Sequence, residues 1–310
     1  MTNDMKKTYH LCLSAGNEVM FRDQEDYNRG FNCFALALHR TGSTGLVESF
    51  MSTHCHLMVE TEDPKSLMYS MRMPYSKLFN NKYGREGKLG ERYHFKIEVV
   101  GFYHRLSAAC YTLRNAVHHG VVPIPYAYNN STANSIFKHA MGKDSPIITL
   151  PQKSFYRFIG KRAEYPDSYK MDSSGLFVRE SVLDIAQVEN MFGTPRAFDY
   201  YMGRKTSEEW TKEQARDNNN LPPVTLSDIE NGITLHSLNQ MLMYENGKAD
   251  YRKMSDIELC NLIDKQILPQ LGIASVYQLS LGEKRRIAED LYCKLHIGEA
   301  QIRRCLALLE

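Results

Sequence analysis

Several features that would classify the chain at once are missing from its sequence. Its seven cysteines include no C-x-x-C pair, which argues against a zinc site, and a disulfide framework is not expected in 310 residues of this composition. No segment approaches the roughly 18 apolar residues of a membrane helix, and the N-terminal residues carry no secretion signal. We therefore expect a cytoplasmic protein with no membrane partner and mostly buried cysteines.

A strong excess of one charge is also missing. The net charge of +2 identifies no partner by itself, so a nucleic-acid surface must come from uneven placement of Lys and Arg. Histidine, in contrast, is unevenly distributed, because eight of the 11 histidines lie before residue 120. This asymmetry indicates that the chemistry lies in the N-terminal region.

The spacing of apolar residues predicts an α+β fold over the first 120 residues. Strands are expected at 9–21, at 46–60 in two pieces, and at 96–100, with helices at 23–38, 63–83 and 103–119. In the second helix Asp63 is a capping residue, Pro64 opens the first turn, and Gly84 ends it. This order resembles a ferredoxin-like antiparallel sheet with helices on one face.

Composition divides the chain into three regions. We expect a first domain over 1–130, a loop-rich extension and linker over 131–223, and a mainly helical C-terminal region over 224–310. Within the C-terminal region, a helix is expected at 255–271. Two more are expected within 280–308, around a turn at 296–298, a spacing that fits a helix-turn-helix with Arg303 and Arg304 on its second helix.

Two short segments carry the chemistry. His54 and His56 lie one residue apart in an apolar strand, so they point to the same face while Cys55 points to the core. Tyr111 and Asn115 lie four residues apart on a helix and share one of its faces. Two imidazoles and an amide can hold a divalent cation, and a nearby tyrosine can attack a phosphate. Each segment alone also fits a structural explanation: a half-buried imidazole pair, or a tyrosine that packs a helix on a sheet.

Together these segments resemble the single-tyrosine HUH transposases, especially the REP-associated tyrosine transposases. That family carries His-hydrophobic-His on a central strand, here His54-Cys55-His56. Its helix carries Tyr-x-x-x-Asn-Pro-Val-x-x-Gly, here Tyr111 to Gly120 with Ala116 in place of the proline. The resemblance covers about residues 8–130 and implies the HUH nuclease fold.

The resemblance also implies an activity. Tyr111 would attack single-stranded, hairpin-containing DNA to give a 5′-phosphotyrosine, with Mg²⁺ or Mn²⁺ held by His54, His56 and Asn115. Basic residues of the 65–96 segment and of the last helix are the expected DNA contacts. They are Arg72, Lys77, Lys82, Arg85, Lys88, Arg92, Arg303 and Arg304. Aromatic residues among them either stack on bases or, as Tyr75, Phe79 and Tyr83, form the buried stripe of a helix.

Two other functions compete with this one. A domesticated protein could keep the fold and bind DNA hairpins without cutting them, although all four active-site residues are present. A replication-initiator or relaxase nickase usually carries a third metal-binding histidine or paired tyrosines, and neither stands in the matching place. The oligomeric state stays open between a monomer and a homodimer.

Overall fold

The computed structural model describes residues 6–90, 94–143, 147–203, 207–217, 222–225, 243–245, 248–250 and 254–308. Arg92, one of the expected DNA contacts, lies outside the described residues. The seven cysteines form no disulfide, and all except Cys293 are buried. None of the helices among the described residues combines the length and apolar composition needed to cross a bilayer.

A four-stranded antiparallel sheet organises the first hundred residues. Its strands are β1 (Lys7–Ser14), β2 (Thr44–Phe50), β3 (His54–Thr61) and β4 (Phe95–Glu98), in the order β2-β3-β1-β4. β3 is therefore an inner strand, with β1 on one side and β2 on the other. The α+β class and the central position of the strand that carries His54 and His56 are confirmed.

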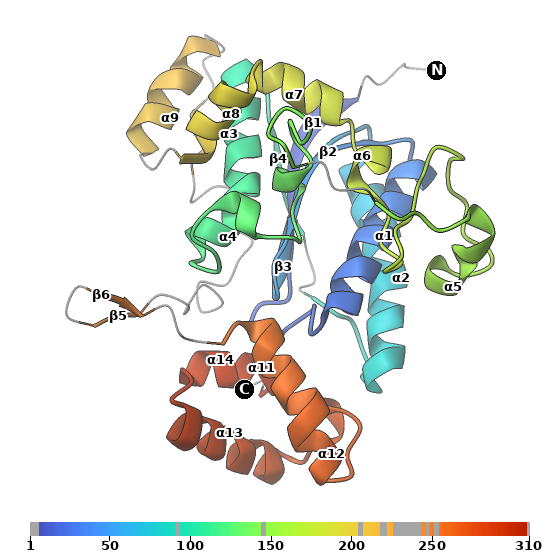
Figure 1. The fold of residues 1–310 in the computed structure, drawn as a ribbon, viewed down its shortest axis with the longest axis vertical. Coiled ribbons are helices and arrows are strands. Elements are labelled where there is room, and N and C mark those ends of the chain that lie inside the picture. Colours follow the sequence, from blue (N-terminus) through green and yellow to red (C-terminus); the bar gives the residue numbers. More distant parts are fainter. Residues whose placement is uncertain are drawn as a thin grey trace.

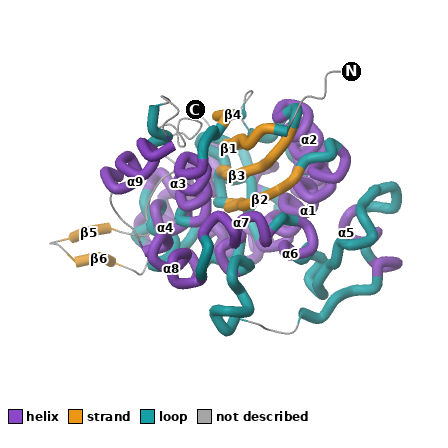
Figure 2. Tube along the Cα trace, turned by 90° about the horizontal axis from the view of Figure 1, so that it is seen from above, coloured by secondary structure: helices purple, strands orange, loops and turns teal. Residues whose placement is uncertain are grey.

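Helices cover both faces of this sheet (Figures 1 and 2). α1 (Gln24–Arg40) and α2 (Pro64–Tyr83) pack on one face, and α3 (Phe102–Leu113) and α7 (Ile185–Phe192) contact strands on the other. The expectation of helices on one face is therefore wrong. The reason lies in β3, where Leu57 and Met58 point to opposite faces and both are fully buried.

The caps of α2 match the sequence prediction. The Asp63 side chain accepts hydrogen bonds from the backbone N–H groups of Lys65 and Ser66, and Pro64 occupies the first turn. Gly84 ends the helix in the left-handed conformation, with φ of 60°. α2 therefore begins after its N-cap Asp63 and ends before Gly84, as these residues predict.

The helix expected over 103–119 is two helices. α3 ends at Leu113, and α4 (Asn115–His118) follows after Arg114, whose ψ of 3° turns the chain. The backbone hydrogen bonds on each side of Arg114 are kept, from its own N–H to Cys110 and from His118 to its carbonyl. The break places Asn115 at the first position of α4.

Residues 131–143 and 147–203 fold over the core in short elements. They comprise η2 (Thr132–Asn134), η3 (Gln152–Ser154), α5 (Tyr156–Ile159), α6 (Arg179–Val182), α7 and α8 (Pro195–Gly203), preceded by η1 (Pro125–Ala127). Phe155 and Phe177 join the cluster under α1 and α2, whereas Phe198 joins the cluster under α3. α9 (Ser207–Gln214) adds Trp210 to the second cluster, and η4 (Ala215–Asp217) follows it.

The C-terminal helices form a third apolar cluster. They are α11 (Asp256–Leu262), a π-helical turn (Ile263–Ile267), α12 (Leu268–Gln270), η7 (Val276–Gln278), α13 (Leu281–Leu295) and α14 (Glu299–Cys305). The turn between α13 and α14 lies where the sequence predicts it. This mainly helical region also contains two short strands, β5 (Met243–Glu245) and β6 (Lys248–Asp250), which pair antiparallel.

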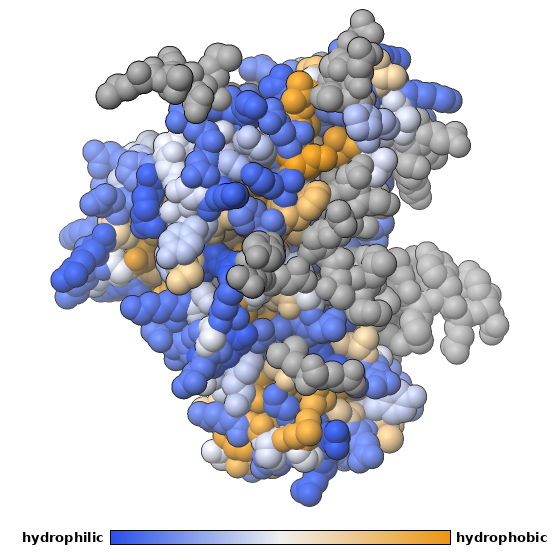
Figure 3. Space-filling model, turned by 180° about the vertical axis from the view of Figure 1, so that it is seen from behind, coloured by the Kyte–Doolittle hydropathy of each residue, from blue (hydrophilic) through white to orange (hydrophobic). Residues whose placement is uncertain are grey.

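The C-terminal helices dock beside the end of the sheet where β3 begins (Figure 1). The fully buried Arg22 side chain reaches Asp264 at 2.7 and 2.9 Å and donates to the Cys305 carbonyl at 2.7 Å. Val19 joins their apolar cluster. Figure 3 shows that the face opposite to the view of Figure 1 is mostly hydrophilic, with one apolar patch near the top and another over these helices.

Candidate active site

The two histidines of the β3 motif lie side by side on the α3 face of the sheet. His54 and His56 are both buried, and their ring centroids are 5.1 Å apart. Cys55, between them, points into the opposite cluster with α1 and α2. The alternation predicted from the sequence is confirmed, and it directs both imidazoles toward the chain that follows α3.

Asn115 meets the first of these histidines. Its Oδ1 lies 3.2 Å from the Nε2 of His54, and its Nδ2 lies 3.2 Å from the Nε2 of His119. His119, the C-cap residue of α4, is also buried. The amide is thus held between two imidazoles, and three side chains from β3 and α4 share one site.

A further histidine supports His56 from the neighbouring strand. The Nε2 of His10, on β1, lies 3.1 Å from the Nδ1 of His56, and the two rings stack with centroids 5.1 Å apart. The other nitrogen of His10 lies 3.4 Å from the hydroxyl of Thr112 on α3. These contacts leave the Nε2 of His56 buried, with no hydrogen-bond partner among the described residues.

All four imidazoles are held neutral by their surroundings. Burial lowers the pKa of His10 to about 3 and the pKa of His54 to about 4. Burial, reinforced by the neighbouring histidines, brings the pKa values of His56 and His119 well below the usual range. Neutral imidazoles keep a lone pair, which is the form that binds metal ions.

The residues present fit a divalent cation held by two imidazoles and an amide. No group of three or more His, Cys, Asp and Glu side chains suited to a metal occurs among the residues that the structure describes. His54 Nε2 and Asn115 Oδ1, which lie 3.2 Å apart, are close enough that one cation could bind both atoms. The unpartnered Nε2 of His56 would supply a third ligand atom.

Tyr111 lies one turn before Asn115, at the C-terminal end of α3. Its half-buried ring is tilted against Trp210 of α9, with centroids 6.1 Å apart, and Trp210 stacks on Tyr201 of α8. The aromatic side chain therefore packs with the cluster under α3. Its restraint by Trp210 is a feature that the sequence could not reveal.

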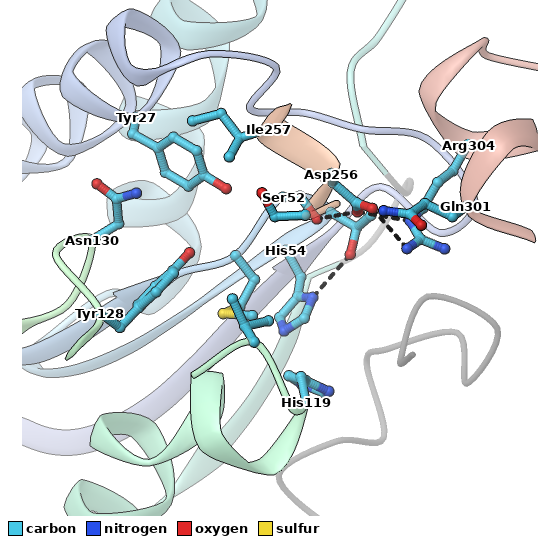
Figure 4. Close-up of a pocket in the computed structure, with 14 residues that line it drawn as sticks. Tyr27, Ser52, His54, His119, Tyr128, Asn130, Asp256, Ile257, Gln301 and Arg304 are labelled. Atoms are coloured by element: carbon cyan, nitrogen blue, oxygen red, sulfur yellow. Dashed lines mark hydrogen bonds and ion pairs between the residues drawn. The ribbon is translucent and has the colours of Figure 1, made fainter. Parts of the chain in front are cut away.

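The site borders a pocket that the C-terminal helices help to form (Figure 4). His54 and His119 line it from the sheet and from α4, and Asp256, Gln301 and Arg304 line it from α11 and α14. Asp256 accepts a hydrogen bond from Ser52 at 2.6 Å, which joins the sheet and the C-terminal helices beside His54. The C-terminal helices therefore form one wall of the pocket.

Within this wall, Arg304 on α14 is bonded to Asp256 on α11. It makes two hydrogen bonds of 2.7 Å to the Asp256 carboxylate, and both side chains are buried. Although burial alone would raise it, Arg304 and Ser52 hold the pKa of Asp256 below its usual range. Arg303, the next residue, is more exposed and lies 3.5 Å from Glu299. Of the two arginines expected to contact DNA, only Arg303 is placed at the surface.

A basic groove lies between α2 and the segment that leads into β4. Its lining includes the cationic residues Lys65, Arg72, Lys77, Arg85, Lys88 and Lys96, together with His94 and one acidic residue, Glu86. Tyr69, which is 67% exposed, stands among them. Burial and the positive charges of Lys96 and Arg72 lower the pKa of His94. The groove thus combines clustered positive charge with an exposed aromatic ring.

Other predicted contacts have structural roles. Lys82 is bound by Asp23 and Asp26 at 2.8 Å, away from the groove lining. Arg85, at the groove, makes two hydrogen bonds to Glu18 at 2.7 and 2.8 Å. The aromatic stripe of α2 is buried in the core, as the structural explanation predicted; it comprises Tyr75, Phe79 and Tyr83.

Two comparisons with known proteins find no match, neither to a family model nor to a curated protein. Among solved structures, the chain is similar to a REP-associated tyrosine transposase bound to a REP hairpin. The sequence identity is 12%, the match covers 44% of this chain and 82% of that chain, and the TM-score is 0.37.

Proposed function

We propose that the chain is a metal-dependent nickase and strand transferase for single-stranded DNA, of the HUH type and on a ferredoxin-like sheet. The observation that carries this proposal is that His54 lies against both His56 and Asn115 on the buried α3 face of β3. One ligand atom there, the Nε2 of His56, has no partner among the described residues. A buried imidazole nitrogen is costly without a partner, so its presence supports a bound group.

The proposed reaction exchanges one phosphoester for another. The phenol of Tyr111 loses its proton and its oxygen bonds to phosphorus, while the bond from phosphorus to the 3′-oxygen breaks and that oxygen takes up a proton. The products are a 5′-phosphotyrosine and a 3′-hydroxyl, so strand rejoining needs no ATP. Mg²⁺ or Mn²⁺, held by His54, His56 and Asn115, would polarise a non-bridging phosphate oxygen.

The proposed substrate is single-stranded or hairpin DNA. The basic groove supports this, because Arg72, Lys77 and Lys88 can follow a phosphate backbone while Tyr69 stacks on an unpaired base. Arg303 on α14 is a further contact in this proposal. The protein acts as a monomer or as a homodimer, which sedimentation of the DNA complex distinguishes.

A second candidate is a protein that binds DNA hairpins without cutting them. The packing of the Tyr111 ring against Trp210 favours it, because this contact gives the ring a structural role in the cluster under α3. In this case the basic groove still binds DNA, and the histidines have a structural role only.

Cleavage of labelled hairpin oligonucleotides with Mn²⁺ or Mg²⁺ separates the two candidates. The nickase predicts metal-dependent cleavage that Tyr111→Phe and His54→Ala abolish. Tyr103→Phe, which removes a hydroxyl from the same helix eight residues earlier, is the matched control and keeps activity. Tight binding without cleavage by the wild type under both metals establishes the binding protein instead.

A further inference from the structure

The hydrogen bonds of Thr112 determine where His10 carries its proton. The Thr112 hydroxyl has a single hydrogen, and it donates to the Ala108 carbonyl at 2.9 Å. Towards the Nδ1 of His10, 3.4 Å away, the same oxygen can therefore only accept. A neutral imidazole has one N–H, so His10 carries it on Nδ1 and its Nε2 is an acceptor.

The tautomer of His56 follows from that of His10. Because His10 Nε2 is an acceptor, the Nδ1 of His56, 3.1 Å away, must donate to it. The Nε2 of His56 then carries only a lone pair, and this is the buried nitrogen without a partner among the described residues. The hydrogen bonds from Thr112 on α3 through His10 on β1 to His56 on β3 form a relay, and they leave the Nε2 of His56 with an unshared lone pair beside His54.

The orientation of Asn115 follows from its two contacts in the same way. If its oxygen faces His54, its amide nitrogen donates to the Nε2 of His119 at 3.2 Å. His119 then carries its proton on Nδ1, a buried nitrogen with no partner among the described residues. In this orientation His119 accepts from the Asn115 amide nitrogen while the Asn115 oxygen faces His54.

We propose that His10 and His119, which lie outside the His-x-His and Tyr-x-x-x-Asn segments, are positioning residues of the cation site. His10, held by Thr112, fixes His56 with its Nε2 lone pair free, and His119 fixes Asn115 with its oxygen toward His54. This inference rests on the proposed metal site for its purpose, but the proton positions themselves are properties of the chain alone. Residues that orient metal ligands in this way are worth about 10- to 100-fold in metal affinity.

His54 differs from His56 in one testable respect. In the structure, its Nε2 faces the Asn115 oxygen and its Nδ1 lies 3.1 Å from the Thr53 hydroxyl. Without metal, His54 donates from Nε2 to Asn115; a cation at Nε2 requires the proton on Nδ1, where Thr53 can accept it. Metal binding thus changes the tautomer of His54 and leaves that of His56 unchanged.

Nitrogen NMR of ¹⁵N-histidine-labelled full-length protein reads these tautomers directly, without metal or DNA. We expect His10 and His56 in the Nδ1–H form and His54 in the Nε2–H form, with only His54 changing when Mg²⁺ is added. A His56 proton on Nε2 in the metal-free wild type overturns the inference. If the tautomers agree but the protein never cleaves DNA, the proposed function fails and the inference stands.

Binding of Mn²⁺, followed by electron paramagnetic resonance, tests the relay through variants. Thr112→Val removes the acceptor for His10 with little change in volume, and we expect about 10-fold weaker binding; His119→Leu should have a similar effect. Thr112→Ser keeps the hydroxyl and should restore affinity to within about 2-fold. Thr61→Val, a buried threonine at the other end of β3, is the matched control. Equal affinity in Thr112→Val and wild type contradicts the proposal.

Discussion

Arg304 offers a sharp test, because the sequence suggests a DNA contact and the structure gives it another role. Its guanidinium makes two 2.7 Å hydrogen bonds to Asp256, and both side chains are at most 9% exposed. Arg304→Gln leaves the Asp256 carboxylate buried without its cation. Removing one partner of a buried pair costs about 3–5 kcal/mol of unfolding free energy.

Urea unfolding followed by circular dichroism measures this cost. With a slope of about 3 kcal/mol per molar urea, the midpoint of Arg304→Gln should fall by about 1–1.7 M. Arg303→Gln, on the same helix, is the matched control. Its ion pair with Glu299 is exposed and 3.5 Å long, so the change should stay within about 0.5 kcal/mol.

The loss of unfolding free energy in Arg304→Gln should also depend on pH, in a direction that follows from the pKa of Asp256. In the wild type, Arg304 lowers the pKa of Asp256, so the pair stabilises the fold above the unfolded value of about 3.9 and is lost as the pH falls through the lower folded value. In Arg304→Gln, burial acts without that offset and raises the pKa. The penalty should therefore be largest near pH 7 and shrink toward pH 4, where protonation removes the buried charge. An unchanged midpoint together with weaker DNA binding would refute this reasoning.

Three further predictions concern the groove and the core. Lys77→Gln should weaken binding of single-stranded DNA and reduce the slope of log affinity against log salt by about 0.7, measured by fluorescence anisotropy, if it contacts one phosphate. Tyr69→Ala should cost about 1–3 kcal/mol of binding through lost stacking, whereas Tyr75→Phe, in the core, should leave DNA affinity unchanged. Gly45→Val should lower the melting temperature, because an added Cβ would meet Leu38 and Leu183 within 2.7 Å.

Local sequence patterns predicted the elements that position the site. The bend between β2 and β3, the Asp63 cap and the Gly84 stop all depend on residues a few positions apart, so they could be read directly. The helix break at Arg114 could not, because Arg114 is compatible with a continuous helix and the break accompanies the contacts of Asn115. The second helical layer was missed because the spacing that predicts α3 does not tell which face of the sheet the helix covers, and because α7 reaches the sheet from more than 100 residues downstream of β3.

In the candidate site, too, local sequence predicted some residues, whereas others depend on contacts between distant parts of the chain. Sequence spacing alone placed His54 and His56 on one face of a strand, as the structure confirms. His10 could not be recognised, because only the pairing of β1 with β3 brings it to His56. His119 was visible beside Asn115 in sequence, yet spacing gave no sign of its role. Charge alone could not separate Arg303 from Arg304, since only packing against α11 buries the second.

The most direct test of the central claim is to identify the residue that becomes linked to DNA. Wild-type protein and Tyr111→Phe are incubated with a hairpin oligonucleotide and Mn²⁺, digested, and analysed by mass spectrometry. We predict a peptide in which Tyr111 carries a nucleotide through a 5′-phosphate, absent from the variant and from samples treated with a chelator. Cleavage with no such peptide, or a nucleotide attached to another residue, would contradict the account.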